Sequence, residues 1–211
     1  STVGGDITIE SVTGAPPIVR EGEALGVFYG TYYATDDNGE LILTGESTDG
    51  SPVGVPQQER GDLTSNTPQR DADGQPTGDV LRKVIGDPNP DYILGIGTDL
   101  TYKNFNFSML WEAVQGFDVF DADKRTRQGV GVGQLAAQEL TGELPRGYIA
   151  GIYPIEEFRI EDGSFVKLRE VSLGYEFPSL FNSSLENVRL SLIGRNLVSF
   201  DKFFSYDPET N

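Results

Sequence analysis

Carboxylates in Gly-rich loops are the residues of this sequence whose types and spacing could carry out chemistry. Asp71, Asp73 and Gly74 form an Asp-x-Asp-Gly cluster, and Asp79 follows in the same stretch. Ca²⁺ takes about six to eight oxygen ligands from such loops, so these three aspartates are candidate ligands of a structural calcium ion. Because the cluster lacks EF-hand spacing, we favour the alternative of an Asx-type turn, in which the aspartates cap backbone N–H groups.

Two carboxylate pairs and one Gly-rich run are weaker candidates. The pairs Glu156-Glu157 and Glu161-Asp162 could suggest glycosidase chemistry, which needs two acids on either side of one bond. Neighbours on an extended chain point to opposite faces, so a solvated acidic loop is the better interpretation. The run 129–133 has Gly at alternate positions but no following Lys-Ser/Thr, so we expect a loop and not a phosphate site.

The sequence contains no histidine and no cysteine. Their absence removes Ser-His-Asp and Cys-His catalysis, thiolate nucleophiles, disulfides, and His- or Cys-ligated metal and haem sites. Acidic residues outnumber basic ones by 33 to 16, and the resulting net charge of −17 repels phosphate backbones. We therefore predict a protein that is not an enzyme, binds no nucleic acid and needs no cofactor apart from the calcium considered above.

Alternating polarity predicts the elements that position these residues. From residue 92 onward, apolar side chains alternate with small or polar ones, as on strands with one apolar face. The first two strands are separated by two residues, which predicts a hairpin. The alternation weakens near Lys167 and Arg169, where we expect a β-bulge or the membrane edge. The predicted strands are residues 92–102, 105–115, 164–177 and 188–195.

The strand lengths and connections favour a membrane barrel. Strands of soluble sheets usually have about 5–6 residues, whereas membrane-spanning strands need about 9–11. Both strands of the hairpin have 11. Short connections alternate with the long segment 116–163, and aromatic residues lie at strand ends, as in the interfacial girdles of outer-membrane barrels. The alternative is a soluble β-sandwich in which the same aromatics pack in the interior.

The first part of the chain, residues 1–91, differs in composition from the second part, residues 92–211. It holds 16 acidic, 5 basic and 4 aromatic residues, whereas the second part holds 17 acidic, 11 basic and 18 aromatic residues. Gly and Pro interrupt it too often for long elements, so we predict one strand followed by a long acidic loop. We expect only short strands in that loop and one short helix in the second part. These elements are the strands near 26–33 and 40–43 and the helix near 134–140.

Five stretches of sequence, taken in order, resemble a known family. They are EGEALGVFYG at 21–30, GDPNPDY at 86–92 with YKNF at 102–105, EDGSFVKLREVSLGY at 161–175, GRNL at 194–197 and DPE at 207–209. Together they resemble the C-terminal barrel region of the SusC/RagA-like TonB-dependent outer-membrane transporters. No single stretch is specific, but their order extends over most of the chain.

The resemblance implies an all-β fold, with antiparallel long-stranded hairpins from a roughly 22-stranded transmembrane β-barrel that carries long extracellular loops. It implies the cell outer membrane of Bacteroidetes-type bacteria and import of oligosaccharides, peptides or similar nutrients. The implied partners are a SusD-like surface lipoprotein and TonB, which pulls on an N-terminal plug. Since about five strands cannot close a barrel, we expect this chain to be a fragment, with TonB acting through the missing N-terminal part.

The same alternation predicts which side chains face the barrel interior. In a channel these side chains would line the wet lumen, whereas in a soluble fold they would form the solvent face. Binding and passage of substrate, without catalysis, is the expected activity. The lumen-facing candidates are Asp99, Asn106, Ser108, Glu112, Arg189 and Arg195.

The main alternative function is a secreted or surface-exposed β-sandwich module for adhesion or glycan binding, with calcium-stabilised loops. The two hypotheses differ in the burial of apolar strand residues, which would form an outward band in the transporter and a buried core in the sandwich. The aromatic residues of the 116–163 loop have three alternative roles: stacking on sugar rings, binding the lipoprotein partner, or packing within the loop itself. The discriminating residues are Leu94, Leu100, Phe107, Trp111 and Leu173, and the loop aromatics are Phe117, Phe120, Tyr148 and Tyr153.

Overall fold

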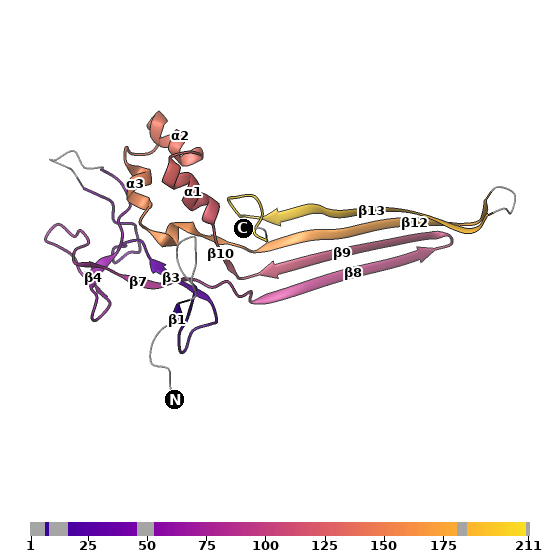
Figure 1. The fold of residues 1–211 in the computed structure, drawn as a ribbon, viewed down its shortest axis with the longest axis horizontal. Helices are drawn as coiled ribbons and strands as arrows, with labels where there is room; N and C mark the ends of the chain where they lie inside the picture. Colours follow the sequence, from indigo (N-terminus) through magenta and orange to yellow (C-terminus); the bar gives the residue numbers. More distant parts are fainter. Residues whose placement is uncertain (1–6, 9–16, 46–52, 181–184, 210–211) are drawn as a thin grey trace. The chain divides into compact units, whose positions relative to one another are not determined.

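Four long strands form one antiparallel sheet in the computed structural model, which describes residues 7–8, 17–45, 53–180 and 185–209. The order across the sheet is β13-β12-β9-β8, so two hairpins lie side by side (Figure 1). The predicted first hairpin is confirmed, while the second pair of strands is longer than predicted. The strands are β8 (Tyr92–Tyr102), β9 (Phe105–Gln115), β12 (Phe165–Leu180) and β13 (Leu185–Asp201).

The two-residue turn sets the register of the first hairpin. Tyr102 pairs with Phe105, and Lys103 at the first central position has a φ of 53°. The favoured two-residue hairpin loops need a positive φ at this position, because their twist then matches that of the strands. The register that follows pairs Leu100 with Phe107 and Asp99 with Ser108.

A β-bulge in β12 lies where the alternation weakens, as predicted. The register of β12 shifts between Leu168 and Glu170 against both of its neighbours, which makes Arg169 the extra residue. Apart from Phe165, the apolar side chains are at even positions before the bulge and at odd positions after it. The bulge therefore keeps Leu168 and Val171 on the same face of the sheet despite the change of phase.

The strands predicted at 164–177 and 188–195 leave residues 178–187 as a connection, and both of its ends are wrong, because β12 continues to Leu180 and β13 begins at Leu185. Pro178 lies within β12, although it cannot donate a backbone hydrogen bond. The pairing of β12 with β9 ends at Tyr175, so Pro178 lies where the strand has only β13 beside it. Proline is tolerated at such one-sided positions.

The chain divides into two units, and the division is not the predicted one at residue 91. Unit 1 comprises Ser1–Asn89, Asp118–Asp162 and Phe204–Asn211, and unit 2 comprises Pro90–Phe117 and Gly163–Phe203. The long segment between β9 and β12 thus packs with the first part of the chain. Both segments contribute fully buried apolar side chains, which explains why they fold together. These side chains are Ile18, Val27, Val55, Leu81, Ile152 and Ile155.

Unit 1 contains short strands in small sheets instead of one strand and a loop. The expected strand near 26–33 is present as β3, whereas that near 40–43 is wrong, because Leu41 and Leu43 form only isolated bridges. The sheets are β1 (Ile7–Thr8), β2 (Pro17–Val19), β3 (Val27–Thr31) and β7 (Arg82–Gly86); β5 (Thr67–Pro68), β4 (Arg60–Asp62) and β6 (Asp79–Val80); and β10 (Asp118–Phe120) with β11 (Ile160–Asp162).

Helices α1 to α3 also belong to unit 1 (Figure 1), so the all-β description holds for unit 2 only. The helix expected at 134–140 is confirmed as α2, while the others were not expected. The first two residues of the Gly-rich run 129–133 end α1, Gly131 caps that helix in the left-handed conformation and Gly133 precedes α2, so only 131–133 form the helix-to-helix connection. Within the described residues, no helix is both long and apolar enough to cross a membrane. The helices are α1 (Ala122–Val130), α2 (Gln134–Thr141), α3 (Tyr148–Ile152) and the 3₁₀ turn Glu156–Arg159.

Candidate functional site

The strand register gives the sheet of unit 2 one continuous apolar face. Leu100 of β8 pairs with Phe107 of β9, which pairs with Leu173 of β12 and through it with Leu192 of β13. Many of these side chains are exposed, with 75% for Leu192 as the extreme. A patch of this extent is unusual on a surface that faces water. Its exposed members are Tyr92, Leu94, Ile96, Leu100, Tyr102, Phe105, Leu173, Leu190, Leu192, Val198 and Phe200.

The residues that discriminate between barrel and sandwich all lie on this apolar face, and none of them is buried. Leu94, Leu100 and Leu173 are exposed, and Phe107 and Trp111 are partly exposed. Among the described residues of unit 2, the long strands form a single sheet, with no second sheet to make a sandwich. An exposed apolar face of this kind is what the transporter hypothesis predicts for these residues, whereas the sandwich hypothesis predicts that they are buried.

The opposite face of the sheet carries all six lumen-facing candidates. Asp99 pairs with Ser108, and Asn106 and Glu112 alternate with them along β9. Arg189 and Arg195 of β13 reach the same face through their partners Glu176 and Glu170 on β12. Leu110 and Ile193 also lie on this face, so it is mixed in character. Sharing a face is a property of the register, whereas facing a lumen stays a prediction.

Charged side chains on this face pair across neighbouring strands. The Arg169 guanidinium lies 2.5 Å from the Glu112 carboxylate, joining β12 to β9. On the β13 side, Arg195 Nε lies 3.0 Å from Glu170 Oε2. Arg189 lies 4.0 Å from Glu176, whose carboxylate also accepts a 3.5 Å hydrogen bond from Asn106. Being exposed, such pairs add little stability, but they fill the polar face with alternating charge.

Three members of this network were missed by the sequence reasoning. They are Arg169 at the bulge and Glu170 and Glu176 beyond it. Each of them is the ion-pair partner of a residue in the candidate set. The alternation of β12 could have identified the two glutamates. Arg169 could not be assigned to a face, because a bulged residue follows no alternation.

Aromatic side chains gather at the tight-turn end of the sheet. The rings of Phe105 and Tyr175 pack edge to face with their centroids 4.7 Å apart, and the ring centroids of Tyr175 and Phe177 are 4.5 Å apart. The Lys103 ammonium lies 5.3 Å from the Tyr102 ring. Aromatic rings next to a cation are typical of the membrane–water interface, where one end of each ring is apolar and the other wet.

The acidity of the chain belongs almost entirely to unit 1. This unit holds 26 of the 33 acidic and 10 of the 16 basic residues, a net charge of −16, whereas unit 2 holds 7 and 6, a net charge of −1. The sheet is therefore nearly neutral, and a partner that approaches unit 1 meets a negative field.

The candidate calcium cluster adopts the turn that we favoured. Asp71 Oδ1 accepts backbone hydrogen bonds of 2.9 Å from Asp73 and from Gln75, which is an Asx-type turn. Asp79 lies in β6. In the part of the chain that the structure describes, no group of three or more His, Cys, Asp or Glu side chains is placed to hold a metal ion.

The pair Glu156-Glu157 is neither a catalytic dyad nor a solvated loop. Glu156 Oε2 accepts the backbone N–H of Thr31 at 2.8 Å, and Glu157 Oε2 accepts that of Tyr33 at 2.8 Å. Ion pairs with the neighbouring strand β7 complete the arrangement at 3.1 Å each. The two carboxylates therefore fasten the 3₁₀ turn to β3, because they satisfy N–H groups that no strand pairs.

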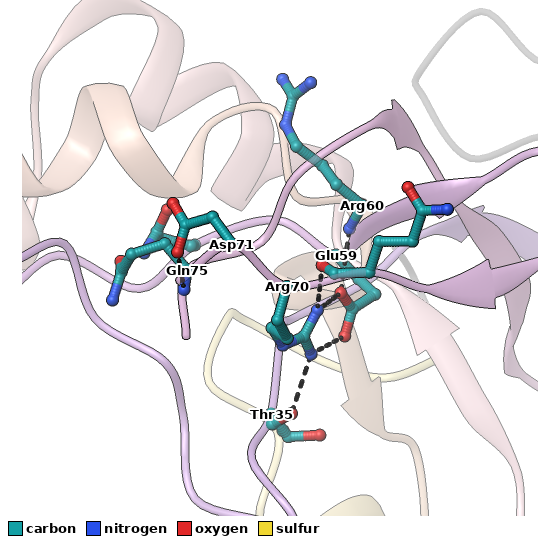
Figure 2. A network of polar contacts seen from close by, with 8 residues as sticks. Thr35, Glu59, Arg60, Arg70, Asp71 and Gln75 are labelled. Atoms are coloured by element: carbon teal, nitrogen blue, oxygen red, sulfur yellow. Dashed lines mark hydrogen bonds and ion pairs between the residues drawn. The ribbon is translucent and has the colours of Figure 1, made fainter. Parts of the chain in front are cut away.

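A buried ion pair links three loops of unit 1. Arg70 donates to both oxygens of Glu59, at 2.6 and 2.8 Å, and to the backbone oxygen of Thr35 at 3.0 Å (Figure 2). The Glu59 side chain is only 3% exposed, and that of Arg70 is 27% exposed. Hydrogen bonding to Glu59 raises the pKa of Arg70. This bidentate pair is a structural clamp, since it leaves no lone charge to act on a ligand.

Asp118 carries a pH-sensitive charge in the small sheet of β10 and β11. Burial raises the pKa of its carboxyl above the usual 3.8, and the nearby carboxylates of Asp162 and Asp87 raise it further. Between the usual and the raised value the folded chain binds more protons than the unfolded chain. The free energy of unfolding therefore falls as the pH rises through this range and stays lower above it.

We expect Asp118→Asn to raise the thermal midpoint at neutral pH, because the amide keeps the hydrogen bond from the Asp87 N–H without a buried charge. The gain should vanish below about pH 3.5, where the aspartate is protonated in both states. Thermal scans of the native protein across this range measure it. Asp36→Asn is the control of opposite sign, since backbone N–H groups lower the pKa of exposed Asp36. A gain for Asp118→Asn that does not change with pH would assign the effect to packing.

The loop aromatics mostly pack within their own units. The ring of Phe120 lies 6.2 Å from that of Phe28 in unit 1, and Phe117 lies 6.3 Å from Phe165 in unit 2. The Arg159 guanidinium lies 5.1 Å from the Tyr153 ring. Tyr148 is half-buried. These contacts favour packing over a stacking platform for sugars.

Comparison with known sequences finds relatives that carry the name TonB-dependent receptor. Over 99% of its length the chain is 32% identical to TonB-dependent receptor P3 of Formosa agariphila, and over 60% it is 29% identical to TonB-dependent receptor P26 of that bacterium. It spans 21% and 14% of these proteins, about a fifth or less of their length. No family model matches the chain.

Comparison with solved structures gives the same picture. The chain matches structures described as the RagAB peptide importer, with a TM-score of 0.57 in the closed-closed state and 0.63 in the open-open state. Its sequence is 17% and 16% identical to the two matched chains. The matches include 98% and 100% of this chain but only 22% of each importer chain. At this identity the likeness establishes the fold, which is that of one section of a larger chain.

Proposed function

We propose that this chain forms a section of the wall of an outer-membrane importer, together with the loops of that section. The chain is a homologue of part of the TonB-dependent receptors, as its sequence predicted. The apolar face of the sheet contacts lipid, and the polar face lines the water-filled interior. One observation carries the proposal: a single sheet of long strands is apolar and exposed on one face and charged on the other.

The dimensions of the strands support this role. β8 and β9 have 11 residues each, which spans the apolar layer of a membrane at the tilt of barrel strands. The aromatic cluster beside the Lys103 turn fits one interfacial girdle. The tight turn then belongs to the periplasmic side, because barrels of this kind have short periplasmic turns and long extracellular loops. Unit 1, which contains the long connections, belongs to the extracellular side.

The two edges of the sheet support a larger barrel. Within the described residues, β8 pairs only with β9 and β13 pairs only with β12, so each has one unpaired edge. Unpaired backbone groups cost several kcal/mol each in lipid. We therefore propose that further strands continue the sheet on both sides and close a barrel. Its number of strands, roughly 22, is what the family resemblance implies.

The proposed activity is import by binding and passage, with no catalytic step. Oligosaccharides, peptides or similar nutrients would cross the interior, guided by hydrogen bonds to a face that carries both signs of charge. TonB would supply the energy through another part of the protein. A SusD-like lipoprotein would close the extracellular opening, and the similarity to an importer named RagAB favours such a two-component assembly.

Cysteine labelling tests the proposed orientation of the sheet. Because the chain contains no cysteine, an introduced thiol is the only one in this section of the protein, and the unsubstituted protein gives the background labelling. We expect Asp99→Cys and Ser108→Cys to react with a charged, water-soluble maleimide in outer-membrane vesicles. Their neighbours Leu100→Cys and Phe107→Cys should react at least about tenfold more slowly, because thiolate formation is suppressed in lipid. Equal labelling of both sets would refute the lipid-facing assignment.

A further inference from the structure

Helix α2 buries very little surface against the rest of unit 1. Within the part of the chain that the structure describes, Ala136 is the only buried side chain of α2, and Leu140 on the same helix is 87% exposed. The burial of one methyl group stabilises a helix only slightly. The position of α2 therefore depends on few contacts.

Glycines with a positive φ bound α2 on both sides. Gly131 and Gly133 precede the helix with φ of 65° and 97°, and Gly142 and Gly147 follow it with φ of 82° and 85°. Glycine passes readily between positive and negative φ, because it has no Cβ. Hinges are built from a few such residues that absorb large backbone rotations. The chain on either side of α2 can therefore rotate without strain.

The two neighbouring helices are fastened more firmly. The Asp121 carboxylate at the start of α1 is fully buried, and it accepts the backbone N–H of Lys124 at 2.8 Å and the hydroxyl of Ser205. Lys124 also forms an ion pair with Glu161 of β11. In α3, the side chain of Ile152 is fully buried. A movement in this region would therefore displace α2 and leave α1 and α3 in place.

The Gln128 amide opposes the closed position of α2. Gln128 is the only buried residue of α1, and among the described residues neither its Oε1 nor its Nε2 has a hydrogen-bond partner. The depressions beside it are lined by residues of α2 and α3, among them Leu135, Ala136 and Ile149. A buried amide without a partner is unfavourable, because it has lost its hydrogen bonds to water. Movement of α2 would let water reach it.

One carboxylate links α2 to α3. Glu139 Oε1 accepts the backbone N–H of Gly147 at 2.8 Å, and its Oε2 accepts that of Ile149 at 2.9 Å. Hydrogen bonds to a charged acceptor are stronger than those between neutral groups. These two bonds therefore contribute more than the contact of Ala136 to keeping α2 beside α3.

We propose that α2 is a lid, which opens on its flanking glycines while α1 and α3 stay in place, and that Glu139 is the latch that keeps it closed. Closure buries one small side chain and gains the hydrogen bonds of Glu139, whereas opening hydrates Gln128. Opening of α2 therefore requires less free energy than unfolding of unit 1. The inference does not depend on the sheet of unit 2 lying in a membrane.

Thiol trapping in the native protein measures the opening, with the unsubstituted protein as background. We expect Ala136→Cys to react with N-ethylmaleimide at least about tenfold faster than Ala34→Cys, because a local opening is more frequent than unfolding of the unit. Ala34 is the matched control, since it is an alanine of unit 1 with no exposed surface. Equal rates at the two positions would overturn the proposal.

Two substitutions in the Ala136→Cys protein test the latch and the amide. Glu139→Ala should raise the reaction rate about tenfold, because two hydrogen bonds to a charged group are lost. Gln128→Leu should lower the rate about tenfold, because closure no longer buries an unpaired amide. Glu143→Ala removes an exposed carboxylate just after α2 and should leave the rate unchanged. The lid is refuted if the rate does not respond to Glu139→Ala or rises with Gln128→Leu.

Hydrogen exchange of the protein without introduced cysteines shows whether the thiol itself causes the opening. The Gly147 and Ile149 amides lose their acceptor when α2 opens, so they should exchange at least about tenfold faster than the Leu81 amide after correction for intrinsic rates. Leu81 is fully buried and donates to the backbone oxygen of Glu59. If all three amides exchange together, unit 1 opens as a whole and α2 is not a lid.

Discussion

Replacing Ile96 by arginine is expected to destabilise the proposed barrel by about 2–4 kcal/mol, the cost of an arginine on the lipid face near the bilayer centre. Ile96 lies near the middle of β8, pairs with Trp111 of β9 and is 56% exposed on the apolar face. The guanidinium would have to lie in hydrocarbon or distort the bilayer to reach water. Urea unfolding of the native protein in lipid vesicles, followed by the heat-modifiable band on a gel, measures the loss.

Ser108→Arg is the matched control on the other face of the same hairpin. Ser108 pairs with Asp99, so a new guanidinium there meets a carboxylate in water. We expect a change within about 0.5 kcal/mol, as for most surface substitutions. If both arginines are tolerated equally, the apolar face does not contact lipid. If Ser108→Arg is the more damaging of the two, the orientation of the sheet is reversed.

Replacing Arg70 by leucine is expected to destabilise unit 1 by about 3–5 kcal/mol, because Glu59 would keep a buried charge without its partner. The substitution also removes the hydrogen bond to the Thr35 oxygen. Hydrogen exchange in the native protein measures the effect at the backbone amides around the clamp. These include Glu59, which donates to Tyr32, and Leu81, which donates to Glu59.

Two further variants separate charge from packing. The double variant Glu59→Leu with Arg70→Leu should recover most of the loss, because replacing a whole buried ion pair by apolar residues is often neutral. Arg127→Leu breaks an exposed pair with Asp123 on α1 and should cost no more than about 0.5 kcal/mol. A double variant as unstable as Arg70→Leu alone would show that packing, not the unpaired charge, is decisive.

The long hairpin was predictable because its information is local. The alternation from Tyr92 to Gln115 specifies a two-faced strand pair, and the two-residue turn specifies its register. The bulge at Arg169 was predictable for the same reason, since a break in phase must be absorbed where it occurs. The candidate polar face follows from this alternation, so its six residues were found together.

The helices and the clamp of unit 1 were not predictable in this way. Asp121 caps α1 by accepting the Lys124 N–H, but α1 carries four charged side chains in nine residues, so no apolar stripe marks it. Glu59 and Arg70 lie 11 residues apart in Gly- and Pro-rich sequence, and nothing local distinguishes them from exposed charges. Their burial depends on loops that only the folded chain brings together.

By itself, the sequence determined the absence of catalytic histidine and cysteine, the acidity, and the two-faced hairpin with its resemblance to TonB-dependent transporters. The tertiary structure decided that residues 118–162 fold with the first part of the chain, that Glu156 and Glu157 fasten a strand, and that Glu139 links α2 to α3. The physical reason is the sequence separation over which each kind of interaction acts. Strand polarity and turn geometry act between near neighbours, whereas burial and ion pairing depend on contacts between residues that are distant in the sequence.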